Sequence, residues 1–166
     1  GWDPTEMEAG LSGIVSVAAA GGVDIGSASD IVTDALTAFG MNAGDSDHFA
    51  DVLAQASASA NTNVSEMGEA FKYVGAAAGA MGYSIEDTAV AIGLMSNAGV
   101  HASMAGTALR RAITGLSAPS KTAQAAMDKY GISLKKDSGE TKSLLEVMTN
   151  LREGLGGIDD EVEQMS

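Results

Sequence analysis

The sequence predicts an all-α fold, a compact array of seven to nine short antiparallel helices with at most one tiny β-hairpin near residues 132–142. Three observations support this class. Apolar side chains recur at intervals of three and four residues, capping residues precede these stretches, and glycines follow them. Because the joints between the stretches are short, successive helices should pack as antiparallel neighbours.

Five helices are expected over residues 3–99, each opened by a residue whose side chain accepts hydrogen bonds from first-turn N–H groups. In chain order the expected openers are Asp3 with Pro4, Ser27 or Ser29, Asp45 or Ser46, Asn63, and Ser84 with Asp87. Glycines end four of these helices, around Gly21-Gly22 and at Gly40, Gly82 and Gly99, and Gly82 is placed to adopt the left-handed conformation.

Three further helices are expected in the rest of the chain. The sixth runs roughly over residues 103–117, with a packing seam formed by Ala105, Leu109, Ala112 and Leu116. Pro119 in a first-turn position starts the seventh, and Gly131 closes it. A turn at residues 136–139 indicates the small hairpin. The inner face of the last helix is expected to carry Leu144, Met148, Leu151 and Leu155.

The chain of 166 residues is long enough for one domain with its own core. We place that domain at residues 1–156 and expect residues 157–166 to begin a further helix. Because the sequence begins without Met, we expect it to be a piece of a longer protein. An echo at a spacing of 36 residues is too weak to predict a repeat. It consists of Asn61 and Asn97, Asn63 and Gly99, and Val64 and Val100.

Alanine and glycine dominate the apolar residues, and only 4% of the residues are aromatic. Such a core should be stabilised by close approach of helices, near the short end of the ~8–10 Å range of axial distances. Gly75 and Gly79, one turn apart, favour tight packing over a membrane motif, because the segment between Lys72 and Glu86 is too short to span a bilayer. The uncharged residues 88–109 contain too many polar side chains for a spanning helix.

The net charge of −13 is distributed unevenly. Residues 1–71 hold eleven acidic and no basic residues, which gives −11, whereas residues 88–152 hold eight basic and four acidic ones, which gives +4. An acidic field repels nucleic acid and anionic membranes, so direct nucleic-acid binding is not expected and membrane contact is disfavoured. Two interpretations stay open: the charge keeps the chain soluble, or it meets a basic partner and drives weak self-association.

The sequence offers no catalytic, cofactor-binding or metal-binding motif, and we predict that the chain is not an enzyme. Cysteine is absent, which excludes disulfides and thiolate metal sites. His48 lies among Asp45, Asp47 and Asp51, but it is turned about 100° away from the helix face that Asp47 and Asp51 share. A solvated acidic helix start is the favoured interpretation there. His101 is expected to be a polar residue in a helix–helix joint.

Arg110 and Arg111 lie off the seam of the sixth helix. The favoured interpretation is a solvated surface with the aliphatic stems laid on neighbouring residues. The alternative is an anchor between domains or subunits, since the arginine fork pairs well with carboxylates. The two arginines are therefore the candidate interface residues.

Several short motifs follow one another in a characteristic order between residues 57 and 134. They are a helix start (Gly82, Ser84, Glu86, Asp87), a glycine joint (Gly99, Val100), the next helix (Ala105, Gly106, Thr107, Leu109, Arg110) and a proline (Pro119). In this order the segment resembles the core region of the phage tail tape-measure proteins. Ala102 and Met104 depart from the pattern, which commonly has glycine and a polar residue there.

The resemblance implies a structural component of a phage or prophage tail, located in the virion tail and, during assembly, in the host cytoplasm. In that family a long chain lies in the lumen of the growing tail, its length sets tail length, and it leaves the tube when DNA is ejected. The implied partners are tail tube and tail assembly proteins. The alternatives are a helical protein-binding module of a bacterial secretion or surface system, and a membrane-inserting segment.

Overall fold

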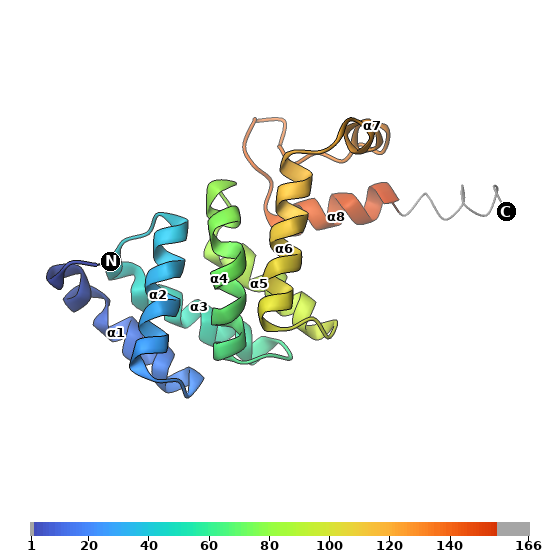
Figure 1. Ribbon diagram of the computed structural model, residues 1–166. Coiled ribbons are helices and arrows are strands. Elements are labelled where there is room, and N and C mark those ends of the chain that lie inside the picture. Colours follow the sequence, from blue (N-terminus) through green and yellow to red (C-terminus); the bar gives the residue numbers. More distant parts are fainter. Residues whose placement is uncertain (1, 156–166) are drawn as a thin grey trace. The chain divides into compact units, whose positions relative to one another are not determined.

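The computed structural model describes residues 2–155, which form α-helices joined by short turns (Figure 1). In chain order the elements are α1 (Pro4–Gly21), α2 (Ile25–Phe39), the 3-10 turn η1 (Ala43–Asp45), α3 (Ser46–Ser59), α4 (Val64–Ala80), α5 (Ile85–Asn97), α6 (Ala102–Ser117), α7 (Lys121–Lys129) and α8 (Leu144–Leu155). The α-helices of the described residues confirm the predicted all-α array. Residues 157–166, where we expected a further helix, lie outside the described residues.

The chain divides into two compact units, and the boundary lies within α6, between Ile113 and Thr114. Unit 1 comprises Gly1–Ile113, and unit 2 comprises Thr114–Ser166. A single domain over residues 1–156 stays a prediction, and unfolding in one cooperative transition would be its signature.

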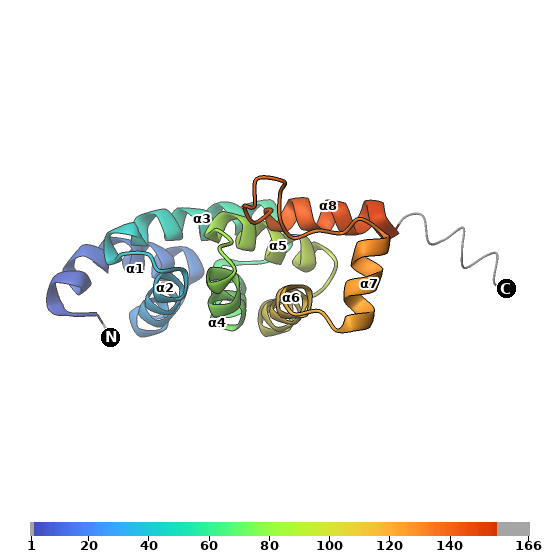
Figure 2. The ribbon, with the colours of Figure 1, turned by 90° about the horizontal axis from the view of Figure 1, so that it is seen from above.

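Unit 1 consists of three consecutive helical hairpins, α1–α2, α3–α4 and α5–α6. The first helices of the hairpins form one row and the second helices form another (Figure 2). Each hairpin stacks on the one before it, because α3 packs on α1 and α5, and α4 packs on α2. Within the first hairpin α1 and α2 cross, with a bend of 119° between them, whereas α2, α4 and α6 run in the same direction along their row (Figure 1).

The stacking of hairpins explains the sequence echo at a spacing of 36 residues. Asn61 lies in the turn between α3 and α4, and Asn97 lies at the equivalent turn between α5 and α6. The two turns are also in contact, because the backbone N–H of Asn61 donates a hydrogen bond to the side-chain oxygen of Asn97 over 2.7 Å. The similarity at a spacing of 36 residues thus reflects a structural repeat, although it was too weak to predict that repeat from the sequence.

Polar side chains cap three helices of unit 1 where predicted. Asp3, Asn63 and Ser84 cap α1, α4 and α5. Asp45 is at the cap position of α3, but its side chain makes no capping hydrogen bond there. The prediction for the second helix is wrong, because the cap of α2 is Asp24 and not Ser27 or Ser29. Asp24 accepts hydrogen bonds from the N–H of Ser27 over 3.0 Å and from its hydroxyl over 2.6 Å. Ser27 therefore lies inside the first turn as a donor, and the helix starts earlier than expected.

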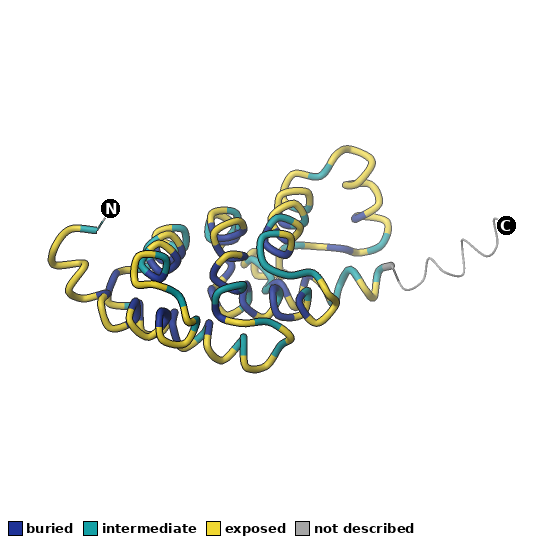
Figure 3. Tube along the Cα trace, turned by 60° about the horizontal axis from the view of Figure 1, so that its bottom comes forward, coloured by how far each residue is buried: buried dark blue, intermediate teal, exposed yellow. Residues whose placement is uncertain are grey.

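All three phenylalanines of the sequence lie together inside unit 1. The ring of Phe71 on α4 makes edge contacts with Phe49 on α3 and Phe39 on α2, at centroid distances of 5.3 and 6.0 Å. Such pairs add about 0.5–1.5 kcal/mol to the stabilisation from burial. Buried positions line the inner sides of the helices (Figure 3). The three phenylalanines are thus concentrated where three helices converge.

Glycines lie where helices of the same row cross most closely. A Cβ on Gly79 of α4 would lie 2.9 Å from the carbonyl carbon of Ala38 on α2, and one on Gly13 of α1 would lie 2.5 Å from the Cβ of Ser46 on α3. Real Cβ atoms essentially never come within 3.0 Å of such neighbours, so a larger residue would push the helices apart. These contacts confirm the tight packing predicted for the glycines of α4.

Unit 2 contains the end of α6, then α7, a loop and α8. The cap of α7 is Ser120, whose hydroxyl accepts a hydrogen bond from the N–H of Ala123 over 3.2 Å. Pro119 therefore precedes the cap and does not lie in the first turn, as we had predicted; its fixed φ sets how the chain enters the helix. In the loop before α8, where we expected at most a tiny hairpin, one antiparallel bridge joins Lys135 and Thr141.

Candidate assembly surface

The motif helix α6 packs on α4 at Gly106. A Cβ at this position would lie 2.9 Å from the Cβ of Tyr73 and closer still to the carbonyl oxygen of Ala70. Thr107, the next motif residue, is half-buried and lines the groove between the two helices. The Ala-Gly-Thr part of the motif is thus a helix-crossing point.

The seam of α6 differs in part from its prediction. Ala105 and Leu109 are buried as expected, but Ala112 and Leu116 are only half-buried and Ile113 is buried instead. The reason is the motif glycine, which lies on the contact face because of its small size. The prediction used apolar side chains only and therefore left Gly106 out. As a result, the predicted contact face of α6 is slightly rotated around the helix from the observed one.

The other motif residues form the turns between helices. Gly82 and Gly99 have φ values of 78° and 85°, which confirms the left-handed positions predicted at the ends of α4 and α5. The hydroxyl of Ser84 accepts a hydrogen bond from the N–H of Asp87 over 3.1 Å and so caps α5. These residues determine where the chain turns, and they bring no reactive groups together.

Ala102 has a positive φ of 47° at the start of α6. Among residues 2–155 it is the one residue other than glycine with such a backbone. The left-handed region strains residues with a Cβ by roughly 1–2 kcal/mol. This strain gives a physical reason for the glycine that the family pattern commonly has at this position.

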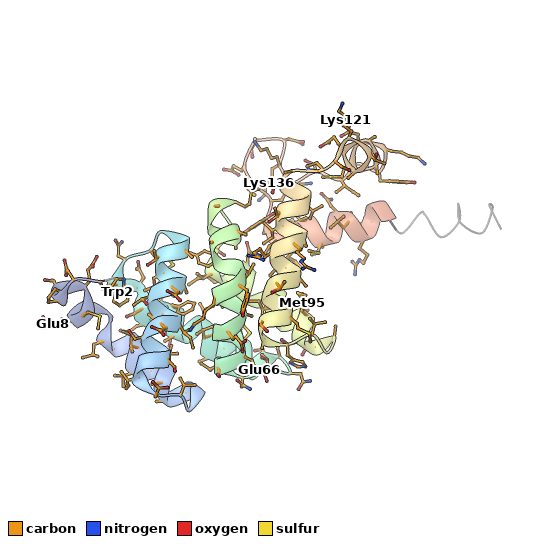
Figure 4. All side chains as sticks on the ribbon, in the orientation of Figure 1. Trp2, Glu8, Glu66, Met95, Lys121 and Lys136 are labelled. Carbon is orange, nitrogen blue, oxygen red and sulfur yellow. The ribbon has the colours of Figure 1, made fainter. Side chains whose placement is uncertain are left out.

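Both histidines of the sequence pair with a glutamate of another helix. Nε2 of His48 on α3 lies 2.7 Å from a carboxylate oxygen of Glu86 on α5. Nδ1 of His101, in the turn before α6, lies 3.3 Å from a carboxylate oxygen of Glu66, but the two atoms are not aligned for a hydrogen bond. Glu66 lies at the start of α4 (Figure 4). Both pairs connect the α3–α4 hairpin to the α5–α6 hairpin. Sequence reasoning missed them because the partners are far apart along the chain.

The pKa of Glu86 is lowered from its ordinary value. Burial raises this pKa, but hydrogen bonds to the carboxylate from its own backbone N–H, from His48 and from Ser84 together outweigh burial. The side chains of His48 and Glu86 are 56% and 51% exposed, so solvent screens their attraction. A pair of this kind contributes at most about 1 kcal/mol to stability.

Arg110 and Arg111 are exposed on α6. Between α4 and α6 lies a groove lined by Tyr73, Ser103, Met104, Thr107, Ala108 and Arg111. Tyr73 and Met104 are 44% and 63% exposed, although both are large and partly apolar. Sequence reasoning missed these two because each lies outside the inward-facing stripe of its helix. An aromatic residue or a methionine on the outer side of a helix is the signal that could have found them.

A second, more apolar groove of about 370 Å³ lies between α3 and α5, in the other row of helices. Val90 and Leu94 of α5 line it and are exposed, opposite Val52 and Ala56 of α3. Glu86, the partner of His48, also lines this groove. A further groove in unit 1 is lined by residues of α2 and α4, among them Thr37 and Lys72.

Among residues 2–155, no group of three or more His, Asp or Glu side chains is placed to hold a metal ion. Over the same range, no single helix is both long and apolar enough to cross a membrane. Helices α1 and α2 taken together are long and apolar enough, but the chain bends by 119° between them.

Comparison with known proteins shows the family of the chain. The sequence model of the phage-related minor tail protein family matches residues 1–166, and the chain belongs to this family. It is 36% identical to the tape measure protein of Pneumococcus phage Dp-1 over 161 residues. The aligned region covers 97% of this chain and 14% of that protein. It is 29% identical over 105 residues to the probable tape measure protein of Escherichia phage P2, covering 63% of this chain and 13% of that protein.

The chain therefore spans about one seventh of the length of these relatives. No solved structure matches it. The resemblance predicted from residues 57–134 is confirmed, and the family match extends it to residues 1–56.

Proposed function

We propose that this chain is a compact helical node of a tape measure protein and acts as a structural, non-enzymatic part of a phage or prophage tail. The observation that carries the proposal is the similarity over 97% of the chain to a protein named tape measure protein. The motif residues support it, since they form turns and helix crossings rather than a reactive site.

The hairpins limit how much tail length this segment can span. A continuous helix rises about 1.5 Å per residue, so a single rod of this chain's length would reach about 250 Å. The longest described helix, α1, has 18 residues and reaches about 27 Å. Because unit 1 stacks its helices sideways, we infer that other parts of a tape measure protein supply most of the ruler.

We place the chain in the lumen of the virion tail and, before assembly is complete, in the host cytoplasm. Its partners in this proposal are tail tube and tail assembly proteins, and it needs no cofactor. The chain would leave the tube together with the DNA.

The composition and length of tails test the proposal. Peptides of this chain should be found by mass spectrometry in purified tails. An in-frame deletion of residues 46–117, which removes the second and third hairpins, should abolish tails or change their length in electron micrographs. Tails without the chain, or normal tails of unchanged length after the deletion, would contradict the proposal.

Two other classes of function predict different results. A membrane-inserting segment would bind lipid vesicles at neutral pH, and a module of a secretion system would be recovered with secretion proteins and not with tails. In our proposal, vesicle flotation leaves the chain in the unbound fraction.

A further inference from the structure

The face of unit 1 formed by α4 and α6 carries residues that are typical of protein interfaces. Tyr73 from α4 and Met104 from α6 line the groove between these helices together with Arg111. Tyrosine, methionine and arginine are enriched in interface cores, where they provide large contact areas and specific polar groups. Gly106 sets the width of this groove by bringing α6 against the backbone of α4.

The helix that contributes Met104 to this face also carries both arginines of an acidic unit. Residues 1–113 contain thirteen acidic residues and three basic ones, Lys72, Arg110 and Arg111. Both arginines lie on α6, and Arg111 lines the groove. Lys72, although it precedes Tyr73 on α4, lines a different groove together with residues of α2. An acidic and partly apolar partner therefore fits this face better than a basic one.

Helix α1 carries a complementary surface. Met7, Leu11 and Val15 are 42%, 51% and 47% exposed and lie four residues apart, so they form one stripe along the helix. Glu8 borders this stripe and is exposed on α1 (Figure 4). Gly13, which contacts α3, points roughly 160° away from Leu11 around the helix. The stripe borders the buried residues Ile14 and Ala18, and it is the part of this side of α1 that the stack leaves exposed.

We propose that the α1 stripe (Met7, Leu11 and Val15 with Glu8) of one copy docks into the α4–α6 groove (Tyr73, Met104 and Arg111) of a second copy. In this contact the apolar stripe covers Tyr73 and Met104, and Glu8 approaches Arg111. A copy cannot fill its own groove, because its α1 is packed on α2 and α3, at the opposite end of the row of hairpins from α6 (Figures 1 and 2).

The contact joins two different surfaces, so it can repeat from copy to copy and either close into a ring or extend into a filament. One helix in one groove is a small interface, which makes the association weak in solution. Confinement of several copies in one tube would raise their effective concentration and populate the contact. The inference goes beyond the proposed function, and a chain that stays monomeric in solution could still be a tail component.

Sedimentation equilibrium of the complete chain, in ~50 mM and ~500 mM salt, tests the contact. The wild type should associate as its concentration rises, and less so at the higher salt. Leu11→Asp in the stripe and Arg111→Glu in the groove should each remain monomeric. The matched control is Val90→Asp, which changes an apolar residue of α5 that is as exposed as Leu11 but outside both surfaces. It should associate like the wild type.

The decisive experiment mixes the two variants that are expected to be monomeric on their own. Leu11→Asp keeps an intact groove and Arg111→Glu keeps an intact stripe, so an equal mixture should regain association that neither has alone. A misfolded variant could not produce this recovery, and circular dichroism of each variant checks its helix content. The proposal is overturned by a wild type that is monomeric at every concentration, by association that survives both substitutions, or by a mixture that stays monomeric.

Discussion

Gly106 on α6 faces the backbone carbonyl of Ala70 on α4 so closely that no side chain fits between them. Gly79 on α4 makes the same kind of approach to Ala38 on α2. The distances between neighbouring hairpins are therefore set by backbone against backbone, and glycine is the residue that permits this. One of these glycines lies within the motif that resembles the tape-measure family, which connects the family resemblance directly to the spacing of the stack.

Replacing Gly106 with alanine should destabilise unit 1 by about 1–3 kcal/mol, because the added methyl group overlaps the backbone of α4. This loss should exceed the ~1 kcal/mol by which alanine is the better helix former. The matched control is Gly115→Ala on the same helix, where a Cβ would meet nothing within 4 Å. Urea unfolding should show the control as stable as the wild type or more so; a Gly106→Ala protein of unchanged stability would refute the close crossing.

Ala102→Gly should stabilise the chain by roughly 1 kcal/mol, since glycine adopts a positive φ without the strain that a Cβ brings. Ala105→Gly serves as the comparison, because Ala105 is buried in the helical part of α6 and should lose stability on the same change. Thermal unfolding followed by circular dichroism measures both. A lower melting temperature for Ala102→Gly would count against the left-handed start of α6.

Ser46→Ala should stabilise the chain by about 1 kcal/mol, because the buried hydroxyl of Ser46 has no hydrogen-bond partner among the described residues. The matched change is Ser96→Ala, since the buried hydroxyl of Ser96 donates to the carbonyl oxygen of Ile92 over 3.0 Å. Removing that satisfied hydroxyl should be neutral or slightly destabilising. If both changes altered the free energy of unfolding in urea equally, the hydroxyl of Ser46 would not be the unsatisfied group.

His48→Ala should raise the pKa of Glu86 toward its ordinary value of 4.5. A carboxyl whose pKa is depressed by folding stabilises the protein above its unfolded pKa, and this contribution disappears as the pH falls through the folded pKa. The variant should therefore lose up to about 1 kcal/mol above pH 4.5 and nothing in stronger acid. NMR titration of the carboxyl groups measures the shift. Glu146, held by Ser143 and Lys136, is the internal reference and should titrate unchanged.

The sequence was sufficient to predict the number and type of the helices, because caps and left-handed glycines are local signals. The caps at Asp3, Asn63 and Ser84 are examples. Asp24 was missed because a serine three residues later is an equally good capping residue, and only the hydrogen bond between them decides which one caps.

The candidate assembly surface was only partly predictable. Arg111 stood out by its charge, but Tyr73 and Met104 join it only because α6 crosses α4 at Gly106. The pairing of His48 with Glu86 likewise depends on how α5 stacks on α3. Contacts between hairpins depend on how the hairpins stack. The similarity at a spacing of 36 residues was too weak to predict this stacking from the sequence.

The most direct test of the account is whether this chain lies inside the tail. Intact particles and particles that have ejected their DNA are treated with proteinase K, and peptides of residues 2–113 are quantified by mass spectrometry relative to the tail tube protein. The chain should be protected in intact particles and be degraded or lost from the tube after ejection. Degradation to the same extent in intact particles would contradict it.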